Sequence, residues 1–179
     1  TQGYQPCIVL LNGEYFGMFE IRENRDERFF ENHFGITEGN LEKVKIPDIG
    51  KKRETSAEND FLALVEYVRT HDLSEEDCFA YVESQLDVEQ FLDYVLIQLY
   101  LYNLDWMKNN CDFFRAIVPK EDSVREDGRW RVVLYDVDYS INYEETNNYE
   151  TFYESEEYCA VLLKGLLENE ACKERFVQR

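Results

Sequence analysis

The sequence predicts an α+β fold in which paired strands dominate the first part of the chain and helices dominate the second. Apolar and aromatic residues surround a tight Asn12-Gly13 turn near the start, and from Thr55 onward apolar residues recur at helical spacing. Hydrophobic residues make up 44% of the 179 residues and aromatic residues 15%. The chain can therefore bury a core, which an intrinsically disordered sequence cannot.

The first element is a predicted β-hairpin. The run from Cys7 to Leu11 is apolar, and the run from Glu14 to Ile21 is rich in aromatic residues. An Asn-Gly pair between two such runs is the strongest short-range hairpin signal that a sequence offers. We therefore expect two antiparallel strands here.

A short helix and a third strand are expected next. Asn24 and Glu27, three positions apart, form a capping pair for a helix that runs through Phe34. Residues 39–46 have the composition of a strand. The polar, basic loop of residues 47–53 then separates these elements from the helical part.

We expect a single domain over residues 1–179, with a small lobe at roughly 1–53 and a larger helical lobe at roughly 54–179. The chain starts within a strand-like run and stops within a helical pattern, as a fragment of a longer protein would. No run approaches the roughly 18 apolar residues of a membrane span, so we expect no span in this fragment.

Three helices of the larger lobe are predicted from capping pairs that precede apolar residues at helical spacing. The pairs are Thr55 with Glu58, Ser74 with Asp77, and Asp87 with Gln90. The third of these helices leads the chain to Asp105.

A second hairpin is expected from two apolar runs, residues 111–118 and residues 129–135, which an acidic loop separates. Asp136 lies at the exit of this hairpin. Residues 142–157 are polar and rich in tyrosine without periodicity, so we expect no regular element there. Helical spacing returns over residues 157–178.

The formal net charge of −19, from 38 acidic and 19 basic residues, argues against nucleic acid as a partner because a polyanion would be repelled. Basic polypeptides, divalent cations and a nucleotide bound to a metal remain compatible with this charge. The alternative is an acidic surface that only keeps the protein soluble.

The five cysteines are widely spaced and odd in number, so they do not form a disulfide framework. With two histidines in the chain, a Cys/His zinc site would require distant residues to converge. The cysteines therefore do not indicate whether the protein works in an oxidising or a reducing compartment.

The first candidate site is the segment from Asn103 to Asn110, which carries Asp105 at the end of a predicted buried helix. Asn110 follows Asp105 by five positions, the spacing of the Asp and Asn in the catalytic loop of protein kinases. There the Asp accepts the proton of the attacking hydroxyl and the Asn amide oxygen helps to hold Mg²⁺. By itself, this spacing is a weak signal.

The second candidate is the Asp136-Val-Asp138 segment after the predicted strand. Alternation along an extended chain would place both carboxylates on one face, and such hard oxygen ligands suit Mg²⁺, Mn²⁺ or Ca²⁺. The simpler interpretation is a strand end with two solvated acids.

Two further residues complete a possible nucleotide site. Lys43 is the candidate cation for the nucleotide phosphates, and Glu23 is the candidate acid that would orient it. Spacing cannot choose between Lys43 and Lys45, and most strand lysines are simply exposed.

Taken in order, these stretches resemble the CotH family, the spore-coat-type atypical protein kinases. The resemblance rests on residues 11–35, residues 40–43, the NLDWMKNN stretch of residues 103–110, the GRWRVVLYDVDYSI stretch of residues 128–141, and residues 166–179. Together they span nearly the whole chain in the family's order.

The resemblance implies an atypical protein-kinase-like fold, with the second hairpin carrying the metal site, and phosphorylation of Ser or Thr in coat or extracellular proteins with ATP and Mg²⁺. It implies Asp105 as the catalytic acid-base residue, and Asn110 and Asp136, with Asp138, as metal ligands. Lys43 would contact the phosphates and Glu23 would orient it. A basic Ser-containing polypeptide would suit so acidic a partner.

Two other interpretations remain. The first is a non-catalytic module of a surface or coat assembly that binds a metal ion or a partner through these acids. The second takes Asp136 and Asp138 as the metal motif of a nucleotide-sugar glycosyltransferase. It fits poorly, because hairpins followed by helices do not suggest the alternating parallel α/β domain of such enzymes.

Overall fold

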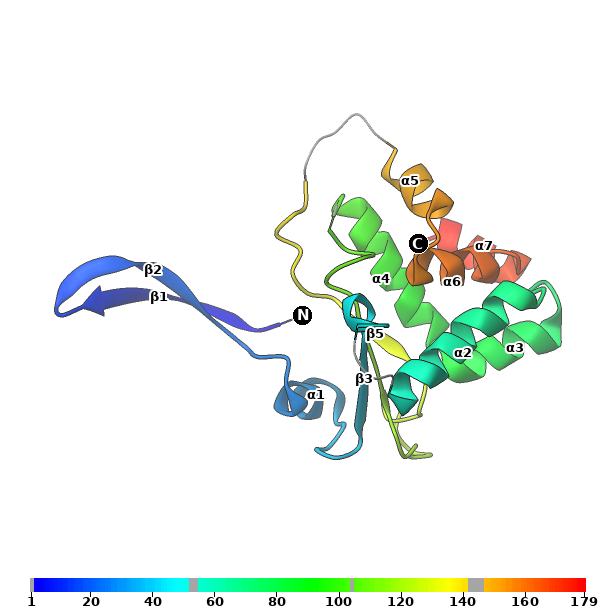
Figure 1. The fold of residues 1–179 in the computed structure, drawn as a ribbon, viewed down its shortest axis with the longest axis horizontal. Helices are drawn as coiled ribbons and strands as arrows, with labels where there is room; N and C mark the ends of the chain where they lie inside the picture. Colours follow the sequence, from blue (N-terminus) through cyan, green and yellow to red (C-terminus); the bar gives the residue numbers. More distant parts are fainter. Residues whose placement is uncertain (1, 52–54, 104, 142–146) are drawn as a thin grey trace.

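The computed structural model describes residues 2–51, 55–103, 105–141 and 147–179, and it confirms the predicted α+β class. Two antiparallel sheets lie in this part of the chain (Figure 1). One is the hairpin of β1 (Tyr4–Leu11) and β2 (Glu14–Arg22). The other has the order β3-β4-β5, from strands Leu41–Lys45, Asp112–Ala116 and Arg131–Val133.

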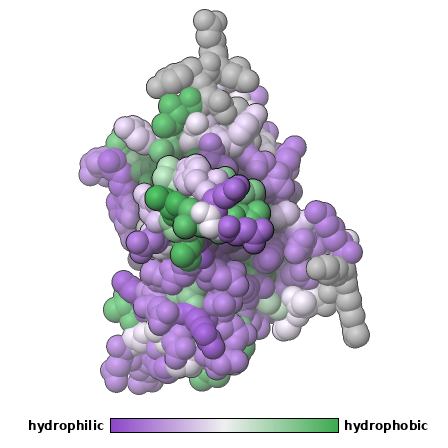
Figure 2. Space-filling model, turned by 90° about the vertical axis from the view of Figure 1, so that its left-hand side faces the viewer, coloured by the Kyte–Doolittle hydropathy of each residue, from purple (hydrophilic) through white to green (hydrophobic). Residues whose placement is uncertain are grey.

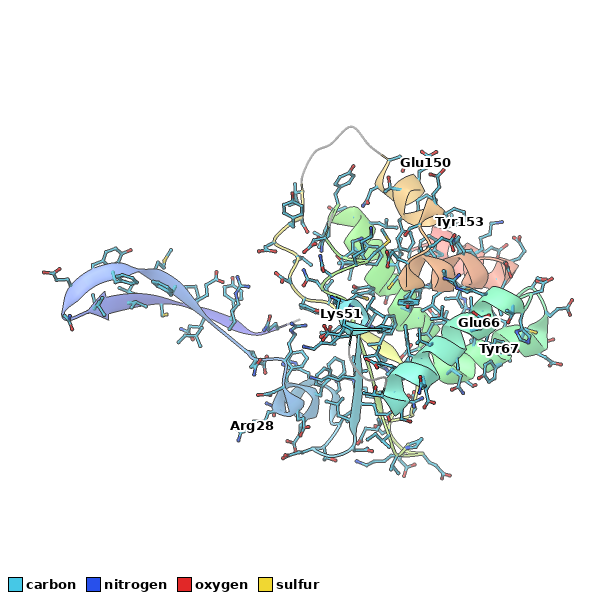
Figure 3. All side chains as sticks on the ribbon, viewed as in Figure 1. Arg28, Lys51, Glu66, Tyr67, Glu150 and Tyr153 are labelled. Atoms are coloured by element: carbon cyan, nitrogen blue, oxygen red, sulfur yellow. The ribbon has the colours of Figure 1, made fainter. Side chains whose placement is uncertain are left out.

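The first hairpin forms as predicted, with Asn12 and Gly13 both at positive φ (53° and 86°). Positive φ at both central residues is the requirement of the hairpin turn that Asn-Gly favours. The hairpin projects from the body of the protein, and its side chains extend into solvent on both faces (Figures 1 and 3). Figure 2 shows apolar surface on the exposed hairpin. Ile8, Leu10 and Met18 of this hairpin are each more than half exposed.

The three-stranded sheet separates two apolar clusters. Val44, Phe113 and Val132 are register partners and pack into the large cluster shared with the helices. Phe114 belongs instead to a smaller cluster with Phe29 and Phe30 of helix α1. Both faces of β4 are thus covered, which explains why its residues are nearly all buried.

Seven α-helices lie in the described part of the chain. Helix α1 spans Glu27–Phe34, and α2, α3 and α4 span Ser56–Thr70, Glu76–Gln85 and Val88–Tyr100. Helices α5, α6 and α7 span Asn148–Glu154, Tyr158–Leu166 and Glu170–Val177. Among the described residues, no helix combines the length and apolar character needed to cross a bilayer.

Two of the predicted capping pairs are confirmed and two are wrong. Thr55 and Glu58 form a reciprocal capping box, and Asp87 accepts a hydrogen bond from the backbone N–H of Gln90. Helix α1 is capped by Asp26 rather than Asn24, since Asp26 lies directly before the first helical residue. Ser74 likewise stands one residue too early for α3.

The C-terminal part also differs from its prediction. A short helix, α5, forms within the tyrosine-rich stretch because Asn147 caps it and Phe152 is fully buried against the core. The single helix expected over residues 157–178 is two helices, since Asn169 caps a new one after a turn. Such caps act locally and override a continuing apolar pattern.

Helix α6 packs on α2 through Gly165. A Cβ atom at this position would lie 2.3 Å from Cγ1 of Val68 and 3.3 Å from Cδ1 of Leu73. Val68 is buried and β-branched, so its side chain cannot rotate away freely. This close approach fixes how tightly the two helices pack.

We expect Gly165→Ala to lower the free energy of unfolding by about 1–3 kcal/mol, because the overpacking outweighs the gain in helix propensity. Urea unfolding measures it. The double variant Gly165→Ala/Val68→Ala removes the obstructing methyl groups and should lose less than the two single losses added together. Simple additivity of the two losses would contradict this account.

Candidate functional site

The loop after α4 brings Asp105 and Asn110 together. The side-chain amides of Asn109 and Asn110 donate hydrogen bonds to the two carboxylate oxygens of Asp105, over 2.6 and 3.1 Å. The backbone N–H of Asp105 donates to Oδ1 of Asn103, which is buried and bonded to Gln98. The Asn109 and Asn110 amides therefore orient the Asp105 carboxylate, while Asn103 anchors the Asp105 backbone to Gln98 of α4.

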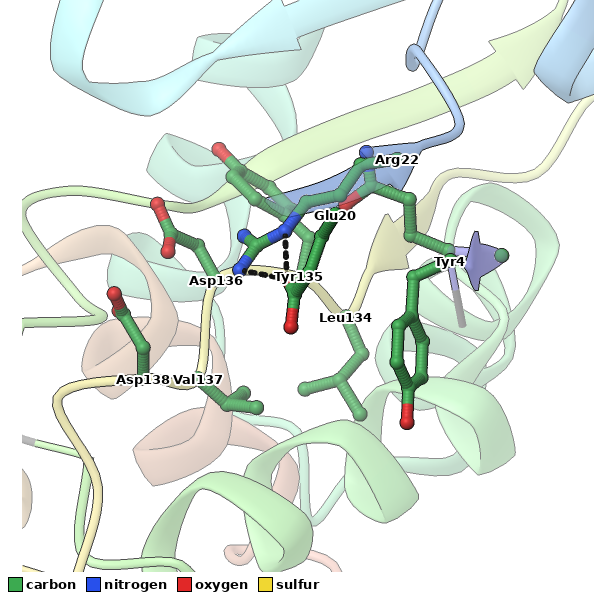
Figure 4. Close-up of a pocket in the computed structure, with 10 residues that line it drawn as sticks. Tyr4, Glu20, Arg22, Leu134, Tyr135, Asp136, Val137 and Asp138 are labelled. Atoms are coloured by element: carbon green, nitrogen blue, oxygen red, sulfur yellow. Dashed lines mark hydrogen bonds and ion pairs between the residues drawn. The ribbon is translucent and has the colours of Figure 1, made fainter. Parts of the chain in front are cut away.

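Asp136 and Asp138 form the second part of the site. They follow β5 and line a cavity of about 350 Å³ together with Tyr4, Glu20 and Arg22 of the hairpin (Figure 4). The pKa of Asp136 is raised, first because burial disfavours the charged carboxylate, and then because Asp138 bonds to it and repels its charge. Two carboxylates are thus held close together, as ligands of a divalent cation must be.

Strand register places these two parts at the same end of the sheet, where β4 begins and β5 ends. Asp112 pairs with Val133, so the residues just before β4 run beside the residues just after β5. The backbone N–H of Ile141 also bonds to the carbonyl of Leu101, over 2.7 Å. The loop that carries Asp136 and Asp138 therefore passes along the loop that carries Asp105.

The backbone is unusual at two of the three candidate ligand positions. Asn110 and Asp136 have positive φ values of 52° and 51°. Asn and Asp are the non-glycine residues that tolerate this left-handed region best, and such conformations concentrate at functional sites. This signal could not be obtained from residue spacing.

A complete metal cage is not assembled by the described residues, which contain no group of three or more His, Cys, Asp or Glu side chains arranged to hold an ion. The donor set nonetheless fits a hard divalent cation, because Asp136 and Asp138 offer carboxylate oxygens and Asn110 offers an amide oxygen. In this structure the amide group of Asn110 donates to Asp105.

Lys43 and Glu23 are not bonded to each other. The Lys43 ammonium donates to the backbone carbonyl of Arg25 over 3.2 Å and lies 5.3 Å from the ring centroid of Phe30. Burial lowers its pKa, and the positive charge of Lys45 adds to this effect. Glu23 instead binds Nε2 of His33, over 2.8 Å, and the backbone N–H of Gly3.

A charged cluster that sequence reasoning missed lies between these parts. Arg25 forms an ion pair with Asp112 over 3.1 Å, and its guanidinium carbon lies 3.1 Å from the ring centroid of Tyr135. The Tyr135 hydroxyl donates to Asp112 over 2.9 Å. Burial and the charge of Asp112 raise the pKa of Tyr135 well above its usual value. The cluster joins the segment before α1 to the residue adjacent to Asp136.

We expect Asp112→Asn to lower the free energy of unfolding by about 2 kcal/mol, since it leaves the partly buried Arg25 without its buried counter-ion beside Lys43 and Lys45. Denaturant unfolding measures the loss. The matched control is Asp60→Asn, which removes an exposed partner of Arg115 and should cost less than about 1 kcal/mol. Equal losses in the two variants would show that the Arg25–Asp112 ion pair stabilises the protein no more than an exposed ion pair does.

The comparison with known families accounts for the whole chain. A family model described as CotH kinase protein matches residues 1–179. Neither a search of curated proteins nor a search of solved structures gave a match. The match includes both loops described above, the one with Asp105 and the one with Asp136. The chain therefore belongs to the CotH kinase protein family.

Proposed function

We propose that this protein is an atypical protein kinase that transfers the γ-phosphate of ATP to a Ser or Thr hydroxyl of a polypeptide. The observation that carries the proposal is the meeting of the Asp105 loop and the Asp136 loop at the same end of the sheet, in a chain that belongs to the CotH kinase protein family. Phosphoryl transfer needs a proton acceptor and a metal ion beside the same phosphate.

Asp136, Asp138 and Asn110 are the residues that would hold a divalent cation. Mg²⁺ bound to them would neutralise charge on the phosphate oxygens. The raised pKa of Asp136 supports this role, because burial first and the proximity of Asp138 second make its negative charge unfavourable in the absence of a cation. Asn110 would present its amide oxygen, which is distinct from the amide nitrogen that donates to Asp105.

Asp105 would accept the proton of the attacking hydroxyl. Its carboxylate oxygens accept hydrogen bonds from the amides of Asn109 and Asn110, and the buried Asn103 binds its backbone N–H. Such preorientation by neighbouring side chains is what a general base requires, since small displacements reduce the rate strongly.

Lys43 and Glu23 enter the proposal through the family resemblance. Lys43 is half-buried at the Arg25 carbonyl and lines a cavity with Asp26, Glu27 and Arg28, apart from the cavity of Asp136. Contact of Lys43 with phosphate would therefore require its bond to Arg25 to be exchanged. Glu23 would likewise have to leave His33 in order to orient Lys43.

The acidic surface supports a basic polypeptide as the phosphate acceptor. The net charge of −19 attracts a cationic peptide and repels an acidic one. Coat or extracellular proteins are the substrate class that the family resemblance suggests. A non-catalytic module that binds a metal ion or partner is the second candidate, favoured by the separate bonding of Lys43 and Glu23.

We expect Asp105→Ala to reduce phosphate transfer to a basic Ser-containing peptide by at least about 100-fold while Mg²⁺-ATP still binds. Asp136→Ala should instead weaken Mg²⁺-ATP binding by at least about tenfold, because a direct metal ligand is lost. Radiolabel transfer measures the first effect, and calorimetry measures the second.

Asp122→Ala is the matched control, since it removes an exposed carboxylate outside the site. It should change neither property. If the wild-type chain binds the metal ion but neither binds nor consumes ATP, the non-catalytic module is the correct interpretation and the kinase proposal fails.

A further inference from the structure

Arg22 is the cationic residue that faces Asp136 and Asp138 across the cavity between the hairpin and the body. It is the last residue of β2, and its side chain reaches toward the loop that carries the two acids (Figure 4). Among the described residues that line this cavity, Arg22 is the one cation, and three carboxylates accompany it. A metal-bound anion entering here would meet Arg22.

The guanidinium of Arg22 is held in place but retains free donors. Its Nε and Nη2 atoms both bond to the same oxygen of Glu20, over 2.9 and 2.8 Å. A guanidinium carries five N–H groups, and the Arg22 side chain is 57% exposed. The remaining N–H groups are therefore accessible from the cavity.

Charge balance in the cavity favours an anion only when a metal ion is also present. Glu20 above all, and then Asp136 and Asp138, raise the pKa of Arg22, so its positive charge is permanent. A divalent cation on Asp136 and Asp138 would offset their two charges, and Arg22 would then be available to a negatively charged oxygen. Lys43 does not line this cavity in the described structure.

We propose that Arg22 binds a phosphate group of the metal-bound nucleotide, with Glu20 orienting its guanidinium. This inference rests on the proposed function, and it assigns a phosphate contact to the hairpin rather than to the strand that carries Lys43. Arg suits this role because its planar fork pairs with two phosphate oxygens at once.

The test compares Arg22→Gln with the wild-type chain by calorimetry, using Mn²⁺ alone and Mg²⁺-ATP as separate probes. We expect Arg22→Gln to weaken Mg²⁺-ATP binding by about tenfold. Binding of Mn²⁺ alone should stay the same or tighten, because a positive charge beside the ligands is removed. A purely structural role would weaken both, so parallel losses, or no loss of nucleotide affinity, would overturn the inference.

Two further variants sharpen the result. Arg22→Lys keeps the positive charge but loses the planar guanidinium, so it should bind Mg²⁺-ATP with intermediate affinity. Arg69→Gln removes an exposed arginine that pairs with Glu156 and does not line this cavity, and it should behave as wild type. Equal binding by Arg69→Gln and Arg22→Gln would also contradict the inference.

Mg²⁺-pyrophosphate separates this inference from the proposed function. If the wild-type chain binds Mg²⁺-pyrophosphate in an Arg22-dependent manner but does not bind ATP, the phosphate contact stands and the kinase proposal fails. If Mg²⁺-ATP binds and Arg22→Gln has no effect, the kinase proposal stands and the contact fails. Absence of binding to both probes overturns both.

Discussion

The pairing of β4 with both β3 and β5 holds the candidate site together. Strand β4 is buried and fixes the positions of segments that are far apart in the sequence. Its Phe114 pairs with Lys43 of β3, and its Asp112 pairs with Val133 of β5. The Asp105 loop enters this strand, and the Asp136 loop leaves its neighbour. Because β4 is covered on both faces, a shift of its register would disrupt the packing of Phe113 in one apolar cluster and of Phe114 in the other.

The carboxylates of Asp136 and Asp138 lie close together in the candidate site. Asp136 and Asp138 repel each other, while Arg22 and Arg25 lower the pKa of Asp136 and so partly offset that repulsion. Asp112 in turn balances Arg25 inside the protein. These interactions link the hairpin electrostatically to the body of the protein.

The projecting hairpin has an apolar sequence although its side chains are exposed to solvent. Its two strands carry apolar residues on both faces, a pattern typical of strands covered on both sides, yet Tyr4, Ile8 and Met18 are each more than half exposed. Its register is nevertheless well defined, because the Asn-Gly turn and a single irregularity between Val9 and Leu10 set it. The hairpin presents Glu20 and Arg22 to the cavity at its inner end.

Elements with local signals could be predicted from the sequence alone. The Asn12-Gly13 turn and the Thr55 and Asp87 caps were predicted correctly, because each depends on residues a few positions apart. The second hairpin was also predicted correctly, from two apolar runs that an acidic loop joins. The pairing of Asp105 with Asn110 within one loop was also accessible from spacing. Where two caps competed, as with Asn24 and Asp26, spacing alone chose wrongly.

Contacts between distant side chains could be known only from the folded chain. Arg25 lies 87 positions from Asp112, so no pattern along the chain could reveal their ion pair. The separate partners of Lys43 and Glu23, and the approach of Arg22 to Asp136, likewise depend on where the hairpin emerges from the sheet. Local preferences act through neighbouring backbone groups, whereas these contacts are set by the packing of the whole domain.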